Sequence, residues 1–314
     1  MINMVSIKGS VKSLHSVHKG VTKHGDSFHL LDWQNPLVNE ADCFLQTNLM
    51  KPKFLQNETR SQIYQYILNT KKPFLVSESP SFRQTNGYKR LGWYSYKWTQ
   101  GLFGNKNSPN DRWKKFQKET GIQFKDWNSP GNNILIMGQK EGDSSLVDLY
   151  QKYESFYDWV SDIIIEIRRY TDRPIVIRPH PRNLPRGKKL ANNLRKKFKK
   201  INVTVSENYK SNSSINGGDG LQQDLNNAYC TITYNSLSAI ESICQGIPTF
   251  ALDDGSMIWP IAHKDLSKIE DLSYDIDITQ WCNDIAYTQW NTRENKTGES
   301  WAHLKPLIFG EENV

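Results

Sequence analysis

The chain has 314 residues, of which 37% are hydrophobic and 11% aromatic, which is long enough for two domains of roughly 150 residues with cores of their own. Its start has no signal-peptide core, and no apolar run approaches the roughly 18 residues that cross a bilayer. We therefore expect a cytoplasmic protein with no membrane partner. The four cysteines lie far apart without metal-ligand spacing, which argues against a disulfide framework and a zinc site.

The net charge of +7 is unevenly distributed. Residues 1–132 hold 19 basic and 9 acidic residues, residues 133–200 hold 15 and 8, and residues 201–314 hold 6 and 16. A basic front and an acidic tail favour a polyanionic partner for the front. The alternative is a solubility surplus that happens to be uneven.

The first part of the chain alternates between strand and helix patterns. Short apolar runs at residues 42–48 and 73–79 predict strands, and the amphipathic stretch at 58–70 predicts a helix between them. Residues 88–113 are aromatic, basic and rich in Gly and Asn. We predict a long ordered loop there, and such loops in compact domains are commonly functional.

From residue 133 onward the pattern becomes regular. Predicted strands at 133–138, 175–179, 201–206, 229–234 and 247–252 alternate with predicted helices at 153–170, 187–200, 221–228 and 236–246. Alternation at this spacing predicts right-handed βαβ units and a doubly wound parallel sheet. With a domain boundary near residue 132, the fold class is α/β.

The string IVIRPHPRN at residues 175–183 runs from a buried strand into a stiff basic loop. Two prolines restrict the backbone, so Arg178, His180 and Arg182 project from a nearly preset frame. Such rigidity favours holding an anion at the end of the strand. The alternative is a solvated basic turn.

A second informative string, at residues 231–254, places Asn235 and Ser236 where a helix follows a strand. Ser238 lies in its first turn and Glu241 farther along. Helix starts of this kind bind anions, although an ordinary capped helix is the alternative. Since both loops follow strands of one parallel sheet, we expect them to converge on a diphosphate or phosphodiester leaving group without a metal. Asp254, in an Asp pair, is expected to close a loop near the sugar or ribose.

Three strings, NILIMGQKEGDSS, RPIVIRPHPRN and ITYNSLSAIESICQGIPTFAL, resemble successive landmarks of the capsule-polysaccharide-biosynthesis type glycosyltransferases. The resemblance covers residues 130–262. It implies a GT-B fold, in which two Rossmann-like domains turn parallel sheets toward a central cleft. It also implies that the donor nucleotide sugar is bound by residues of these strings, namely Gln139, Arg178, His180, Arg182, Asn235, Ser236, Ser238, Glu241 and Asp254.

The same resemblance implies a domain plan and a donor. Residues 1–132 would bind the acceptor, residues 133–275 would bind the donor, and residues 276–314 would form a helical segment packing back on the first domain. No cofactor or metal is implied beyond the donor, for which a UDP-sugar is favoured and a CMP-sugar is the alternative.

A carboxylate is needed to deprotonate the acceptor hydroxyl while the basic pocket stabilises the departing nucleotide. Family members often carry an acidic E-D-G-F type motif after an early strand. Here the corresponding string is VSESPSF, which keeps Glu78 but has Ser79 and Pro80 next. Asp26, in TKHGDSF, is the competing candidate, and a plain surface acid is the alternative for either residue.

The segment at residues 88–115 interleaves cations with aromatic rings, which is equipment for contacting phosphates and stacking a base. The candidate nucleic-acid-binding residues are Lys89, Arg90, Trp93, Tyr96, Lys97, Trp98 and Arg112. The alternative is a solvated loop anchored by its tryptophans. The basic helix at 187–200 could also follow a phosphate backbone.

RLGW, NDRW, KDLSKIED and residues 284–304 resemble bacteriophage-type versions of the family. That resemblance implies sugar transfer to 5-hydroxymethylcytosine-type bases of double-stranded DNA in a host bacterial cytoplasm. The main alternative is a surface or capsular polysaccharide glycosyltransferase. A non-catalytic nucleic-acid-binding protein and a sugar-nucleotide epimerase are further alternatives.

Overall fold

A computed structural model of the chain describes residues 1–9, 15–47, 59–82, 85, 87–182, 184–208 and 218–310. Internal contacts divide it into two compact units: unit 1 comprises residues 1–120 and 279–314, and unit 2 comprises residues 121–278. Unit 1 carries 21 Lys and Arg against 13 Asp and Glu, a formal charge of +8, and unit 2 carries 19 against 20, a charge of −1. The excess positive charge therefore belongs to unit 1.

The sheet of unit 1 has six strands in the order β11-β5-β4-β3-β1-β2 within the described residues. Its strands are β1 (Asn3–Ile7), β2 (Ser27–Leu31), β3 (Cys43–Thr47), β4 (Phe74–Glu78), β5 (Tyr88–Trp93) and β11 (Gln289–Asn291). The strands β2, β1, β3 and β4 run parallel, whereas β5 and β11 are antiparallel to their neighbours. The short runs of apolar residues in β3 and β4 are buried throughout, as expected of strands covered on both faces.

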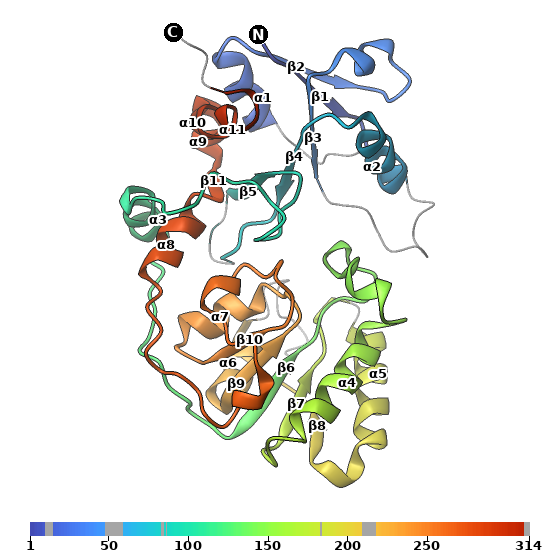
Figure 1. Ribbon diagram of the computed structural model, residues 1–314, viewed down its shortest axis with the longest axis vertical. Coiled ribbons are helices and arrows are strands. Elements are labelled where there is room, and N and C mark those ends of the chain that lie inside the picture. Colours follow the sequence, from blue (N-terminus) through green and yellow to red (C-terminus); the bar gives the residue numbers. More distant parts are fainter. Residues whose placement is uncertain are drawn as a thin grey trace. The chain divides into compact units, whose positions relative to one another are not determined.

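Helices cover both faces of this sheet (Figure 1). They are α1 (His15–Lys23), α2 (Thr59–Thr70), α3 (Asp111–Thr120), α8 (Thr279–Ala286), α9 (Thr292–Thr297), α10 (Glu299–Leu304) and α11 (Pro306–Phe309). Alternate strand residues face opposite sides: Met4 packs in a cluster with α1 and α10, and Val5 packs in a cluster with α2. Residues 279–310 thus complete the core of unit 1.

The sheet of unit 2 is wholly parallel, with the order β10-β9-β6-β7-β8. Its strands are β6 (Asn133–Met137), β7 (Ile175–Arg178), β8 (Val203–Val205), β9 (Ala228–Thr233) and β10 (Thr249–Ala251). From β6 the chain first adds β7 and β8 on one side of the sheet and then β9 and β10 on the other side. The strand order reverses between β6 and β9, which is the topological switch point where open α/β sheets bind ligands.

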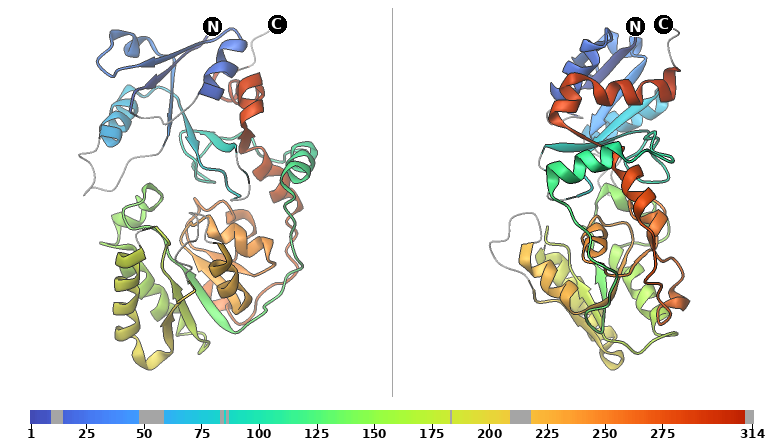
Figure 2. Two further views of the ribbon diagram at one scale, coloured as in Figure 1. Left: turned by 180° about the vertical axis from the view of Figure 1, so that it is seen from behind. Right: turned by 90° about the vertical axis from the view of Figure 1, so that its left-hand side faces the viewer.

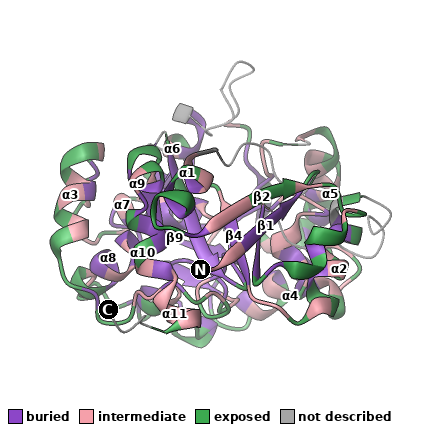
Figure 3. Cartoon of the chain, turned by 90° about the horizontal axis from the view of Figure 1, so that it is seen from above, coloured by how far each residue is buried: buried purple, intermediate pink, exposed green. Residues whose placement is uncertain are grey.

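Helices α4 (Phe156–Ile167) and α5 (Leu184–Lys197) lie side by side on one face of this sheet, and α6 (Gly218–Asn226) and α7 (Ser238–Cys244) lie on the other (Figures 1 and 2). Ile134 and Ile136 pack in the cluster with α4 and α5, whereas Leu135 packs with α6. The continuous apolar run therefore serves both faces. In Figure 3, β9 is buried while the outward side of α5 is exposed.

The fold class expected from the sequence, an α/β protein with two parallel-dominated sheets, is confirmed. One predicted element is wrong at both of its ends. Of residues 88–113, only 94–110 form a long loop, because 88–93 are β5, which is held between β4 and β11, and 111–113 begin α3. The pairing strand β11 comes from the far end of the chain, so no local pattern around residue 88 signals the strand.

Candidate functional site

Four loops meet at one edge of the unit 2 sheet, because β6, β7, β9 and β10 are parallel and all end there. The loop after β6 begins with Gly138 and Gln139, and the loop after β9 begins with Tyr234 and Asn235. These two loops border the switch point of the sheet. We call this edge the switch-point edge.

Gln139 and Asn235 are joined by two hydrogen bonds across the switch-point edge. The Gln139 Nε2 donates to Asn235 Oδ1 at 2.7 Å, and the backbone N–H of Asn235 donates to Gln139 Oε1 at 2.9 Å. Both residues are less than 10% exposed. The two bonds fix the orientation of the Gln139 and Asn235 side-chain amides, because the nitrogen of the Gln139 amide donates and its oxygen accepts.

The network extends from Asn235 to a carboxylate. Asn235 Nδ2 donates to Asp253 Oδ1 at 2.8 Å and to the carbonyl of Ser145 at 3.0 Å. Asp253 is the first of the two aspartates after β10. Its Oδ1 also accepts from the backbone N–H of Gly255 at 3.1 Å, so the loop after β10 is tied to the loops after β6 and β9.

A close backbone contact places the loop after β7 against the loop after β6. The N–H of Gly138 donates to the carbonyl of Arg178 at 2.7 Å. A Cβ atom on Gly138 would lie 2.4 Å from that oxygen and 3.0 Å from the backbone nitrogen of His180, which is too close for any side chain. Glycine at position 138 therefore lets His180 lie beside Gln139.

His180 is half-buried at the switch-point edge, and its ring orientation is set by its own loop. The backbone N–H of Arg182 donates to His180 Nδ1 at 3.1 Å. The same Nδ1 lies 3.5 Å from the carbonyl oxygen of Arg182, so both contacts hold the ring in place; in the tautomer in which Nδ1 accepts, Nε2–H is a donor. The side chain of Arg182 is exposed, so this residue contributes its backbone to the arrangement.

The remaining predicted donor residues differ in their positions. Ser236 and Ser238 share one hydrogen bond between their hydroxyls at 2.8 Å. Only one of the two hydroxyls donates in this bond, so the O–H group of the other can donate to a different acceptor. Glu241 is half-buried within α7, and Asp254 is exposed. In the network it is Asp253, not Asp254, that contacts Asn235.

The structure corrects the role of Arg178. Its side chain is 7% exposed and forms an ion pair with Asp224 of α6, whose side chain is 4% exposed. The guanidinium also donates to the carbonyls of Gly220 and Asn208 at 3.2 and 3.3 Å. These contacts turn the guanidinium toward α6 instead of holding it for donor phosphates.

Glu78 is the last residue of β4, at the carboxyl-terminal edge of the parallel strands of unit 1. It is half-buried opposite Arg90 of β5, and its Oε1 accepts from the backbone N–H of Ser79 at 2.7 Å. Gln46 pairs with Val76, so its side chain is on the same face of the sheet as Glu78, whereas Ser77 is on the opposite face. Gln46 Nε2 is buried and has no hydrogen-bond partner among the described residues, although buried polar groups are nearly always paired in native proteins.

The second carboxylate candidate, Asp26, belongs to the opposite edge of the same sheet. It precedes β2, and β2 is parallel to β1, so Asp26 lies at the amino-terminal edge. Strands of five residues separate the two edges by about 15 Å. Asp26 accepts from Trp301 Nε1 at 2.7 Å and pairs with Lys305 at 3.1 Å. These contacts contradict the prediction of a catalytic base and make Asp26 an anchor for the C-terminal helices.

The environment of Asp26 supports this assignment. Burial by itself raises the pKa of the carboxyl group, but hydrogen bonds from Ile2, Trp301 and Lys305, together with the charge of Lys305, outweigh burial and lower the pKa. Asp26 is therefore held as a carboxylate in the folded state.

Most of the residues predicted to contact nucleic acid are part of the core of unit 1. Arg90, Trp93, Tyr96 and Lys97 are each less than 10% exposed. The guanidinium of Arg90 donates to the carbonyls of Ser79 and Tyr96 at 2.9 and 3.2 Å. A DNA phosphate or base needs an accessible side chain, so these four residues do not form the predicted surface.

Arg112 is likewise engaged within unit 1. Its guanidinium pairs with Glu294 at 3.1 Å and lies 3.7 Å from the ring centroid of Trp290. Of the other predicted contacts, Trp98 is half-buried and Lys89 is exposed. The aromatic and basic residues of this segment thus mainly hold α3 and the C-terminal segment to the sheet.

The part of the chain that the structure describes has neither a cluster of metal ligands nor a helix able to span a membrane. Within it, no cluster of three or more His, Cys, Asp or Glu side chains is arranged to hold a metal ion. No helix in these ranges combines the length and the apolar character that a membrane crossing requires.

Comparisons with known proteins give similarity at the level of structure. No protein-family model matches the sequence, and no curated protein matches it. Among solved structures, the β-Kdo 2,7-transferase of Thermosulfurimonas dismutans KpsC is similar, with 12% identity, a TM-score of 0.47, and coverage of 90% of this chain and 89% of that chain.

Two further solved structures are similar over most of their length. The β-Kdo 2,4-transferase of the same organism's KpsC has 11% identity and a TM-score of 0.44, covering 84% of this chain and 88% of that chain. The UDP-GlcNAc 2-epimerase of Methanocaldococcus jannaschii has 11% identity and a TM-score of 0.36, covering 94% and 96%.

Proposed function

We propose that the protein is a glycosyltransferase that moves a sugar from a nucleotide-sugar donor to a hydroxyl group of a carbohydrate acceptor. The observation that carries the proposal is the chain of hydrogen bonds from Gln139 through Asn235 to Asp253 at the switch-point edge. It is a fixed polar network at the place where open parallel sheets bind nucleotides.

In this proposal the donor's nucleotide lies along the switch-point edge. The Nε2–H of His180 and a hydroxyl of the Ser236–Ser238 pair are the donors for phosphate oxygens. Asp253, bonded to Asn235, is placed to accept from a ribose or sugar hydroxyl. A UDP-sugar is favoured as the donor, with a CMP-sugar as the alternative.

Glu78 is the proposed general base of unit 1. Its carboxylate would accept the proton of the acceptor hydroxyl as that oxygen bonds to the anomeric carbon of the donor sugar. The bond between the anomeric carbon and the phosphate oxygen breaks, and the nucleotide leaves with the electron pair. Gln46 Nε2, on the same face of the sheet as Glu78, would donate to a hydroxyl oxygen of the acceptor.

A carbohydrate acceptor is preferred over a DNA base. The DNA proposal depended on an exposed aromatic and basic surface, and four of its seven residues are buried. The polar edge around Glu78 suits hydroxyl groups, which donate and accept in the same way as the neighbouring side chains.

The test is an acceptor-dependent assay. The purified protein is incubated with panels of UDP-sugars and CMP-sugars, with and without oligosaccharides or hydroxymethylated duplex DNA, and the products are analysed by mass spectrometry. We expect nucleotide release and a one-sugar mass gain on an oligosaccharide. A mass gain on DNA nucleosides, or isomerisation of the donor without an acceptor, would contradict the proposal.

Variants separate the two steps. Asn235→Ala is expected to weaken donor binding, whereas Glu78→Gln should lower turnover by about 10²-fold or more while leaving donor affinity intact. Asn193→Ala, an exposed asparagine of α5, is the control. Equal turnover of Glu78→Gln and the wild type would remove Glu78 as the base.

A further inference from the structure

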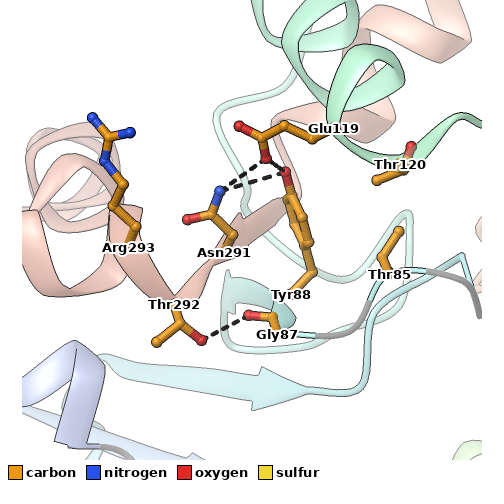
Figure 4. A pocket seen from close by; sticks show the side chains of 8 residues that line it. All are labelled: Thr85, Gly87, Tyr88, Glu119, Thr120, Asn291, Thr292 and Arg293. Atoms are coloured by element: carbon orange, nitrogen blue, oxygen red, sulfur yellow. Dashed lines mark hydrogen bonds between the residues drawn. The ribbon is translucent and has the colours of Figure 1, made fainter.

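A pocket of unit 1 lies outside the residues considered so far (Figure 4). Its volume is about 400 Å³, within the range of small-molecule sites. It is lined by the start of β5, the end of α3 and the junction of β11 with α9, namely by Thr85, Gly87, Tyr88, Glu119, Thr120, Asn291, Thr292 and Arg293. We call it the α3–α9 pocket.

One wall of the α3–α9 pocket is a hydrogen-bonded group of three side chains. The hydroxyl of Tyr88 donates to Glu119 Oε2, and Asn291 Nδ2 donates to the same oxygen at 3.1 Å. Burial and the neighbouring carboxylate of Glu119 raise the pKa of Tyr88, which keeps its hydroxyl protonated as a donor. Figure 4 shows Tyr88 and Asn291 both pointing to this oxygen of Glu119.

This wall is held rigidly from behind. Asn291 Oδ1 accepts from the backbone N–H of Glu294 at 2.8 Å, and the Glu294 carboxylate accepts from the backbone N–H of Asn291 at 2.8 Å. Glu294 is buried and is paired with Arg112 and Lys115 at 3.1 and 2.7 Å. Since its supporting groups are paired in turn, the wall is preorganised for a ligand.

Two groups of the pocket keep unused hydrogen-bonding capacity. Among the described residues, Glu119 Oε1 accepts no hydrogen bond, and the guanidinium of Arg293 makes neither a hydrogen bond nor an ion pair; both side chains are exposed. The first is an acceptor for hydroxyl groups and the second a planar donor for hydroxyl or ring oxygens. The ligand chemistry that fits both is a ring rich in hydroxyl groups.

We propose that the α3–α9 pocket binds a sugar residue, with Glu119 accepting from its hydroxyls and Arg293 donating to its oxygens. Within the glycosyltransferase proposal on which this assignment rests, that sugar belongs to the acceptor. The pocket lies at the carboxyl-terminal edge of the unit 1 sheet, because Tyr88 pairs with Asn291 beyond the register position of Glu78.

The test measures sugar binding without turnover. The full-length protein is applied to an array of defined mono- to tetrasaccharides, and the strongest binder is titrated by calorimetry against the wild type, Glu119→Gln, Arg293→Ala and Lys296→Ala. Lys296 is an exposed cation of α9 that does not line the pocket, so its variant is the control. Thermal unfolding of each variant confirms that it is folded.

We expect the affinity for the sugar to fall by about tenfold or more in Glu119→Gln and Arg293→Ala, and to remain unchanged in Lys296→Ala. Donor binding, titrated separately with UDP and CMP, should be the same in all four proteins. The assignment would be overturned if the wild type bound no sugar, or if Glu119→Gln and Arg293→Ala both bound the sugar as tightly as the wild type. Loss of nucleotide binding with intact sugar binding would instead overturn only the glycosyltransferase proposal.

Discussion

Gln139 and Asn235 are 96 residues apart in the sequence, yet they exchange two hydrogen bonds of 2.7 and 2.9 Å at the switch-point edge. The contact is possible because β6 and β9 are adjacent parallel strands that end at the same level. It connects the loops after two strands into one surface, and the third member of the network, Asp253, adds the loop after β10.

Removing the Asn235 amide is expected to affect stability and donor binding together. Asn235→Ala removes one of the two partners of Asp253 Oδ1 and of Gln139 Nε2, together with the donor to the Ser145 carbonyl, which costs about 1–3 kcal/mol. Urea unfolding measures this loss. The control Asn193→Ala, at an exposed site of α5, should change the unfolding free energy by less than about 0.5 kcal/mol. An undiminished stability of Asn235→Ala would show that the network is dispensable.

The ion pair of Arg178 with Asp224 should have a large effect on stability. Arg178→Met leaves the buried Asp224 carboxylate without its cation, and breaking a buried pair in this way costs about 3–5 kcal/mol. Arg182→Met, two residues away and exposed, is the matched control and should cost less than about 0.5 kcal/mol. The measurement is the urea midpoint of each variant. If Arg178→Met is as stable as Arg182→Met and only donor binding falls, Arg178 is a ligand-binding residue after all.

Asp26 predicts a specific pH dependence of unit 1. Because its pKa is lowered in the folded state from the ordinary value of 3.8, its contribution to stability is fully present above about pH 4 and is lost as the pH falls through the folded-state pKa. The melting temperature of the wild type, read from circular dichroism, should therefore fall as the pH is lowered below about 4.

The variant Asp26→Asn lacks this titration, so its melting temperature should be lower at pH 6 and less sensitive to acid. Asp32→Asn, which removes the exposed ion pair with Lys8, is the control and should behave like the wild type. Identical acid sensitivity of Asp26→Asn and the wild type would contradict the anchoring role of Asp26.

Gly138→Ala tests the close approach of the loops after β6 and β7. The added Cβ would lie 2.4 Å from the carbonyl oxygen of Arg178, so the loops must separate at a cost of about 1–3 kcal/mol. His180 moves with its loop, and donor affinity should fall as well. At Gly187 in α5 an added Cβ would lie 3.2 Å from Pro179 Cβ and from the Tyr157 hydroxyl, which a shift of a few tenths of an ångström relieves, so Gly187→Ala should cost less than Gly138→Ala. Calorimetric titration and urea unfolding of the two variants distinguish these outcomes.

Local sequence patterns predicted much of unit 2. The apolar runs and the prolines after residue 178 set the strand ends, and strands alternating with helices implied a parallel sheet. Since parallel strands share one carboxyl-terminal edge, His180, Asn235 and Ser236 were expected at the same edge, and the structure places them in loops of that edge. The Ser/Asp-bearing turn after β6 did not by itself indicate that the Ser145 carbonyl would contact Asn235.

In unit 2 the sequence by itself determined which segments form strands and helices, because periodicity and backbone restriction act within a few residues, whereas β5 of unit 1 depends on its pairing with distant β11. Only the tertiary structure decided which charged side chains are buried and which partners they contact. Arg178 meets Asp224 of α6, and Arg90 becomes buried because β11 pairs with β5. Both partners are distant in the chain. A cationic side chain that is buried and paired with an acceptor in the core is not available to bind a ligand at the surface. The assignment of Asp253 rather than Asp254 depended likewise on which carboxylate reaches Asn235.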